Sequence, residues 1–128
     1  MTNRQTDDSA YGHLRPDQLH ARIAAAPVAY VPWGALEWHS VHLPLGLDGL
    51  LAECVAERAV AQTGGVVLPA MYLPITALPH RFSISLKAST VRAVLDDLLA
   101  EARAVFPDTH LAHDFLRVEI PRREPETA

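Results

Sequence analysis

The stretch that decides the fold is residues 34–49, Gly-Ala-Leu-Glu-Trp-His-Ser-Val-His-Leu-Pro-Leu-Gly-Leu-Asp-Gly, because it links an expected strand to an expected helix. Glu37 and His39 are two positions apart, so on an extended backbone both side chains leave the same face. Pro44 and Gly46 then turn the chain and allow Asp48 to return toward the same point. Two carboxylates and an imidazole suit Zn²⁺ or Mn²⁺. The stretch therefore predicts a metal-binding group of Glu37, His39 and Asp48.

Asp48 has a second interpretation that the residues alone leave open. It stands at the expected start of a helix, where an Asp side chain accepts backbone N–H bonds as an N-cap and contributes about 1 kcal/mol. An Asp before a helix is more often a cap than a ligand. The metal hypothesis therefore requires the Asp48 carboxylate to turn toward His39.

The flanking sequence predicts the framework. Apolar runs at 28–33 and 66–72 are typical of buried strands, and residues 82–86 alternate like a further strand. Helices are expected over 48–63, where Leu51, Val55 and Ala59 recur every four residues, over 89–106, and over a short segment from 15 to about 26. We predict an α/β fold, a small, mostly parallel sheet with flanking helices, whose ligands gather beyond the carboxyl ends of its strands.

The ends of the chain are polar and suggest the domain limits. Residues 1–14 show no pattern that would bury a face and are expected to form a mobile tail, and residues 121–128 a charged tail. Residues 115–120 alternate apolar with charged side chains, as an edge strand does. We therefore expect one domain over 15–120, with His13 and His20 on its surface.

Composition narrows the classes of protein. A chain of 128 residues with 49% hydrophobic and 20% charged residues is typical of one globular domain. With a net charge of −4 and scattered basic residues, no nucleic-acid or membrane partner is expected. The polar start is unlike a signal peptide, and no apolar run reaches the roughly 18 residues of a membrane span, so we expect a soluble, cytoplasmic protein. Its single cysteine, Cys54, is expected to be an inert buried thiol.

The same stretch resembles the signature of the creatininase (creatinine amidohydrolase) family, commonly Gly-Ser/Ala-x-Glu-Gln-His-Gly-x-His-Leu-Pro-Leu-x-Thr-Asp. The resemblance implies that Glu37, His39 and Asp48 are ligands of a two-metal site, with His42 as the second His near that site. Trp38 stands where Gln is usual, Ser40 where Gly is usual and Leu47 where Thr is usual. None of these differences removes a ligand.

The resemblance covers about residues 17–106 and lacks one later element. Family members continue with a strand ending in Asn-Gly-His-Gly-Gly-Asn, which supplies further ligands and which this sequence does not contain. We therefore expect a creatininase-like half domain. His110 and His113 are the local candidates for additional ligands, although such a pair more often belongs to a polar loop. Trp38 and His80 are expected to line a pocket, because a Pro-rich link carries the chain from residue 73 to 79 over the first site.

The sequence leaves two functions open. The first is a creatininase-like, metal-dependent amidohydrolase acting on a small cyclic or linear amide, with His42 as an acid/base or orienting group. The alternative is a non-catalytic domain that keeps the scaffold and acts by associating with itself or with a full-length relative, and a truncated product is a third interpretation. Homo-oligomers are expected in either case, because a half-length fold leaves a sheet edge or helix face uncovered.

Overall fold

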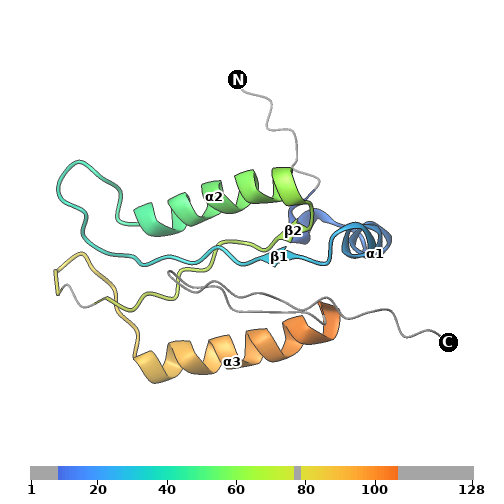
Figure 1. Cartoon of the computed structure of the whole chain (residues 1–128). Coiled ribbons are helices and arrows are strands. Elements are labelled where there is room, and N and C mark those ends of the chain that lie inside the picture. Colours follow the sequence, from blue (N-terminus) through green and yellow to red (C-terminus); the bar gives the residue numbers. More distant parts are fainter. Residues whose placement is uncertain (1–8, 77–78, 107–128) are drawn as a thin grey trace.

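The structure is a computed structural model that describes residues 9–76 and 79–106. Figure 1 shows α2 and α3 on opposite sides of the extended segments that carry the two strands. Helices and a small parallel sheet give the α/β class that the sequence predicted. In chain order the elements are η1 (Tyr11–His13), α1 (Pro16–Ala25), β1 (Ala29–Tyr30), α2 (Leu47–Thr63), β2 (Val66–Val67) and α3 (Ala88–Val105).

The sheet is smaller than predicted. Strands β1 and β2 pair in parallel, with Ala29 opposite Val66 and Tyr30 opposite Val67. A parallel bridge between Trp33 and Met71 continues this alignment toward the site. The expected runs at 28–33 and 66–72 therefore lie where the sequence placed them, although only two residues of each are regular strand.

The third expected strand, at 82–86, is reduced to one bridge. Ile84 pairs with Leu36, and the pairing is antiparallel. The ladder stops because the next backbone donor on the site loop, the N–H of Trp38, is bound by the Ser83 hydroxyl at 3.0 Å. A side chain thus replaces the backbone partner that a longer strand requires, and the prediction of a strand here was wrong.

The segment before α1 packs on the sheet from residue 9 onward. Ser9 is buried, and its carbonyl accepts a hydrogen bond of 2.9 Å from the N–H of Val67. Ala10 forms a parallel bridge with the same residue. The predicted tail therefore does not extend to residue 14, because the free edge of β2 offers backbone groups that need partners.

Helix α2 buries a face of small residues. Gly49, Ala56 and Val60 are its buried positions, and the last two pack with Val67 and the partly buried Tyr30. Small side chains allow the helix backbone to approach the strands closely, so this face, and not the larger leucines, is turned inward.

The opposite face of α2 corrects two expectations. Leu51 and Val55, whose spacing predicted the helix, are 56% and 65% exposed. Cys54 lies between them and is also exposed, so the prediction of a buried thiol was wrong. The four-residue repeat identified a helix correctly but did not show which of its faces meets the core.

Glycines end α2 as the sequence predicted. Gly64 is its C-cap with φ 74°, and Gly65 follows with φ 96°. A Cβ on Gly65 would lie 2.3 Å from the carbonyl oxygen of Val28, so this turn accepts no other residue without rearrangement. The turn leads directly into β2 and sets its register with β1.

Helix α1 leads into β1. Helix α1 begins with Pro16, and Gln18 accepts a hydrogen bond of 2.9 Å from the N–H of Arg15. His13 and His20 are exposed, as expected. Residues 110, 113 and 115–128, on which several expectations fall, lie outside the described residues.

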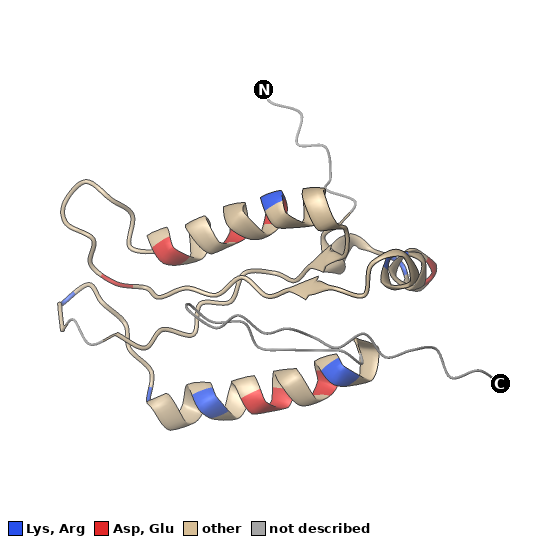
Figure 2. Ribbon diagram, viewed as in Figure 1, with Lys and Arg blue, Asp and Glu red and all other residues tan. Residues whose placement is uncertain are grey.

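Helix α3 has Val91 as its buried residue, and its basic and acidic side chains are interspersed along its length (Figure 2). One such pair is an exposed ion pair of 3.2 Å between Arg92 and Asp96, one turn apart. No helix in the described ranges combines the length and hydrophobicity that a bilayer crossing requires.

Candidate metal centre

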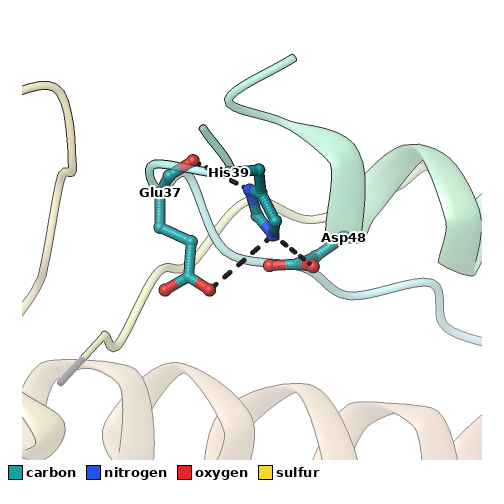
Figure 3. A group of neighbouring side chains, drawn as sticks. All are labelled: Glu37, His39 and Asp48. Atoms are coloured by element: carbon teal, nitrogen blue, oxygen red, sulfur yellow. Dashed lines mark hydrogen bonds and ion pairs between the residues drawn. The ribbon is translucent and has the colours of Figure 1, made fainter. Parts of the chain in front are cut away.

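Three side chains with metal-binding chemistry meet beyond the carboxyl end of β1. Glu37 and His39 belong to the loop that follows this strand, and Asp48 belongs to the first turn of α2 (Figure 3). One ligand atom from each lies within 4.8 Å of the others. The geometric convergence expected from the sequence is therefore present in the structure.

Backbone hydrogen bonds hold the loop that presents these groups. The N–H of Glu37 donates to the carbonyl of Leu45 at 2.9 Å and so closes the turn through Pro44. The N–H of Ile84 donates to the carbonyl of Leu36, also at 2.9 Å, and fixes the other side of the loop. Because these hydrogen bonds hold the backbone at Leu36 and at Glu37, the Glu37 side chain starts from a fixed backbone position.

A close contact of two glycines sets the distance between the loop and α2. A Cβ on Gly34 would lie 2.0 Å from the backbone nitrogen of Gly49, and one on Gly49 would lie 2.3 Å from the Tyr72 ring. Both residues are buried. Only glycine allows this approach, which places the first turn of α2, and with it Asp48, beside His39.

The histidine ring is oriented by its own loop. Nδ1 of His39 lies 3.0 Å from the carbonyl oxygen of Glu37, an acceptor, so this nitrogen carries the proton. In the neutral ring Nε2 then has a lone pair and faces Oδ1 of Asp48 at 3.2 Å and Oε1 of Glu37 at 3.9 Å. Three electron-rich atoms face one another, and a proton on Nε2 or a metal cation between them would stabilise the arrangement.

The distances from His39 to the two carboxylates are close to those around one metal ion. Ligand atoms bound at 2.0–2.2 Å to a tetrahedral Zn²⁺ lie roughly 3.3–3.6 Å apart. Nε2 of His39 lies 3.2 Å from Asp48 and 3.9 Å from Glu37, on either side of this range, and all three ligand atoms lie within 4.8 Å of one another. Side-chain exposures of 19% for His39, 20% for Glu37 and 37% for Asp48 leave the group accessible from solvent. The residues can therefore hold a divalent cation and keep coordination positions open for other molecules.

Asp48 does not act as the helix cap that was its alternative interpretation. Helix α2 begins at Leu47 after an N-cap at Gly46, and no side chain caps it. The Asp48 carboxylate instead contacts His39. An acidic group in the first turn is still favoured by the helix dipole, by about 0.3–1 kcal/mol.

The other predicted site residues are placed differently. His42 is exposed in the loop between His39 and Asp48, and it makes no hydrogen bond or ion pair with any described residue. His110 and His113 fall outside the described residues. Their proposed roles stay predictions.

Trp38 and His80 are brought together by a stacked contact. Their ring centroids lie 4.3 Å apart with planes inclined by 17°. Phe82, which sequence reasoning did not assign to the site region, completes an aromatic cluster with centroid distances of 6.0 and 5.3 Å to these two rings. The guanidinium of Arg81 lies 4.5 Å from the Phe82 ring. The cluster ties residues 80–83 to the loop that carries Glu37 and His39.

The chain matches one known protein family over most of its length. The family model described as creatinine amidohydrolase matches residues 12–105, and the chain belongs to this Creatininase family. This family is one of metal-dependent amidohydrolases, which agrees with the metal-binding group described above.

Shorter matches occur to curated ribonuclease Z proteins of cyanobacteria. The chain is 65% identical to that of Synechocystis sp. over 34 residues, which are 27% of this chain and 10% of that protein. It is 69% identical to that of Trichodesmium erythraeum over 29 residues, 23% of this chain and 9% of that protein. The chain thus spans about a tenth of the length of these relatives. No solved structure matches it.

Proposed function

We propose that this protein is a metal-dependent amidohydrolase that acts on a small amide, with Glu37, His39 and Asp48 as ligands of Zn²⁺ or Mn²⁺. The observation that carries the proposal is the convergence of the three ligand atoms within 4.8 Å in a chain of the Creatininase family. A divalent ion bound there would supply Lewis-acid activation of water and polarisation of the amide carbonyl.

The residues of the chain prepare the site for this chemistry. The carbonyl of Glu37 fixes the tautomer of His39, so that Nε2 presents its lone pair toward the two carboxylates. Glu37 and Asp48 supply two negative charges that balance a divalent cation. Their partial burial limits competition from water, and the remaining exposure admits a substrate.

We assign proton transfer to His42. It lies in the loop that joins the second and third ligands, and its exposed imidazole can exchange protons with bulk water. Its role would be to donate a proton to the leaving amine. Trp38, between Glu37 and His39, stacks on His80 of a second loop, and we propose that the two rings form one wall of the substrate pocket.

Thermal unfolding with added metal tests the proposal. Zn²⁺ or Mn²⁺ at 100 times its dissociation constant should stabilise the protein by about 2.7 kcal/mol and raise the melting temperature. Glu37→Ala and Asp48→Asn should remove most of that rise. His20→Ala, which deletes an exposed imidazole on α1, is the matched control and should keep it.

Activity is measured on the metal-loaded protein by release of amine from a panel of cyclic and linear amides. His42→Ala should lower kcat by about 10²–10⁴-fold with little change in the metal-induced melting shift. If neither metal moves the melting curve of the wild-type protein, His39 and Asp48 form only an ion pair, and the amidohydrolase proposal is wrong.

A further inference from the structure

The proposed metal ligand Asp48 lies in a helical turn that its own sequence holds weakly. Gly46 precedes α2 as its N-cap, and Gly49 follows Asp48 within the first turn. Glycine has the greatest backbone freedom of all residues, and no side chain caps this end of α2. Contacts with other segments must therefore fix the position of the Asp48 carboxylate.

The ring of Tyr72 lies against both glycines. A Cβ on Gly49 would lie 2.3 Å from Cε1, 2.5 Å from Cζ and 2.8 Å from Oη of this tyrosine. A Cβ on Gly46 would lie 3.3 Å from Cε1 and 3.6 Å from Oη. Residues three apart are neighbours on one side of a helix, so one edge of the ring lies along the side of the turn that both glycines share.

Tyr72 follows a segment that hydrogen bonds hold to the start of the site loop. The N–H of Met71 donates to the carbonyl of Pro32 at 2.9 Å, and the carbonyl of Met71 accepts a hydrogen bond of 3.1 Å from the N–H of Gly34. The ring therefore starts from a backbone that is fixed relative to the loop carrying the other two ligands. It can hold the first turn of α2 at a set distance from them.

A second tyrosine packs on the other half of α2. Tyr30 of β1 is partly buried against Ala56 and Val60. At 1.5 Å per residue, Val60 lies roughly 16 Å along the helix from Gly49. Of the two tyrosines, Tyr72 is the one that touches the turn carrying the metal ligand.

We infer that Tyr72 is a positioning residue of the metal centre, whose ring packs against the first turn of α2 and holds Asp48 at its distance of 3.2 Å from His39. The effect of Tyr72 on metal binding rests on the proposed function, whereas its effect on the turn does not. The atoms closest to Gly49 belong to the ring, so Tyr72→Phe should keep the contact and Tyr72→Ala should lose it.

Amide hydrogen exchange of the metal-free protein tests the contact. The N–H of Leu50 closes the first turn of α2 with a hydrogen bond of 3.1 Å, and the N–H of Gly64 closes the last turn with one of 2.8 Å. Tyr72→Ala should speed exchange at Leu50 by about tenfold relative to Gly64, because the first turn then opens locally. Tyr30→Ala is the matched control and should not favour exchange at Leu50, and Tyr72→Phe should behave like the wild-type protein.

Metal affinity is measured by titration with Zn²⁺, and the visible absorption of bound Co²⁺ reports the coordination geometry. Tyr72→Ala should lower the affinity for Zn²⁺ by about 10–100-fold and weaken the Co²⁺ absorption, because the carboxylate of Asp48 is no longer held as a ligand. Tyr72→Phe should restore both. Tyr30→Ala should lower the melting temperature but keep the affinity and the Co²⁺ spectrum.

Three results would overturn the inference. The first is unchanged exchange at Leu50 in Tyr72→Ala, and the second is an unchanged affinity for Zn²⁺ in the same variant. The third is an equal loss of affinity in Tyr72→Ala and Tyr30→Ala, which would indicate general destabilisation. A wild-type protein that binds neither metal would refute the proposed function alone, and the exchange rates would then decide the inference by themselves.

Discussion

Replacing Gly34 by Ala should disrupt the metal centre without touching a ligand. The added Cβ would lie 2.0 Å from the nitrogen of Gly49 and 2.6 Å from the carbonyl carbon of Asp48, whereas ordinary contact begins at 3.4 Å. The atoms that it meets are backbone, so no side chain can rotate away. The loop and the first turn of α2 must separate by about 1.4 Å to restore an ordinary contact.

The magnitude follows from what this separation breaks. Inserting a methyl group against a packed backbone costs about 1–3 kcal/mol and occasionally more. For a domain of this size, 3 kcal/mol corresponds to a fall of roughly 10 °C in melting temperature. The movement also separates Asp48 from His39, whose contact is now 3.2 Å, so metal affinity should fall about 10–100-fold.

The chain offers graded controls for this experiment. A Cβ on Gly12 would meet nothing within 4 Å, so Gly12→Ala should leave stability and metal affinity unchanged. A Cβ on Gly46 would approach the side chains of Tyr72 at 3.3 Å and Leu36 at 3.7 Å, so Gly46→Ala should give a small effect. Urea unfolding and metal titration of the three variants measure both quantities. If Gly34→Ala behaves like Gly12→Ala, the two segments do not approach as described, and the reasoning is refuted.

Three further predictions concern the loop, the core and the ligands. Ser40 has φ 70°, a backbone conformation that costs a non-glycine residue about 1 kcal/mol or more. Ser40→Gly removes this strain but gives the unfolded chain more entropy, so urea unfolding should show a net gain in stability of roughly 0.5 kcal/mol. A loss of stability would contradict this. Val91→Ala on α3 truncates a side chain that is 2% exposed and should lower the free energy of unfolding by about 2 kcal/mol. Val94→Ala, at a residue of the same helix that is 39% exposed, should lower it by less than about 1 kcal/mol. Equal losses of stability would show that α3 is packed differently. The melting-temperature gain from metal should shrink as pH falls from about 8 to 5, because protons compete with the ion for its ligands; a gain that is independent of pH would argue against coordination by His39.

The sequence predicted much of the framework because several local signals agreed. Gly64 and Gly65 end α2 where the chain adopts positive φ, and Pro16 begins α1. The parallel pairing of β1 with β2 follows from two apolar runs separated by a helix. These features depend on backbone preferences of individual residues, which a sequence displays directly.

The errors arose where a neighbour distant in sequence decided the outcome. The Ser83 hydroxyl binds the N–H of Trp38 and stops a third strand. The carbonyl of Ser9 satisfies the edge of β2 and orders part of an expected tail. Neither interaction leaves a periodic signal, because each depends on one polar group meeting a partner on another segment.

For the site itself, the sequence alone determined which residues have the right chemistry and that Glu37 and His39 leave the chain on one side. Their spacing of two residues is sufficient for this, and the family signature added Asp48. Only the tertiary structure decided that Asp48 contacts His39 instead of capping α2. That outcome depends on the approach of Gly34 to Gly49, a distance between two backbones that no local preference specifies and that packing alone fixes.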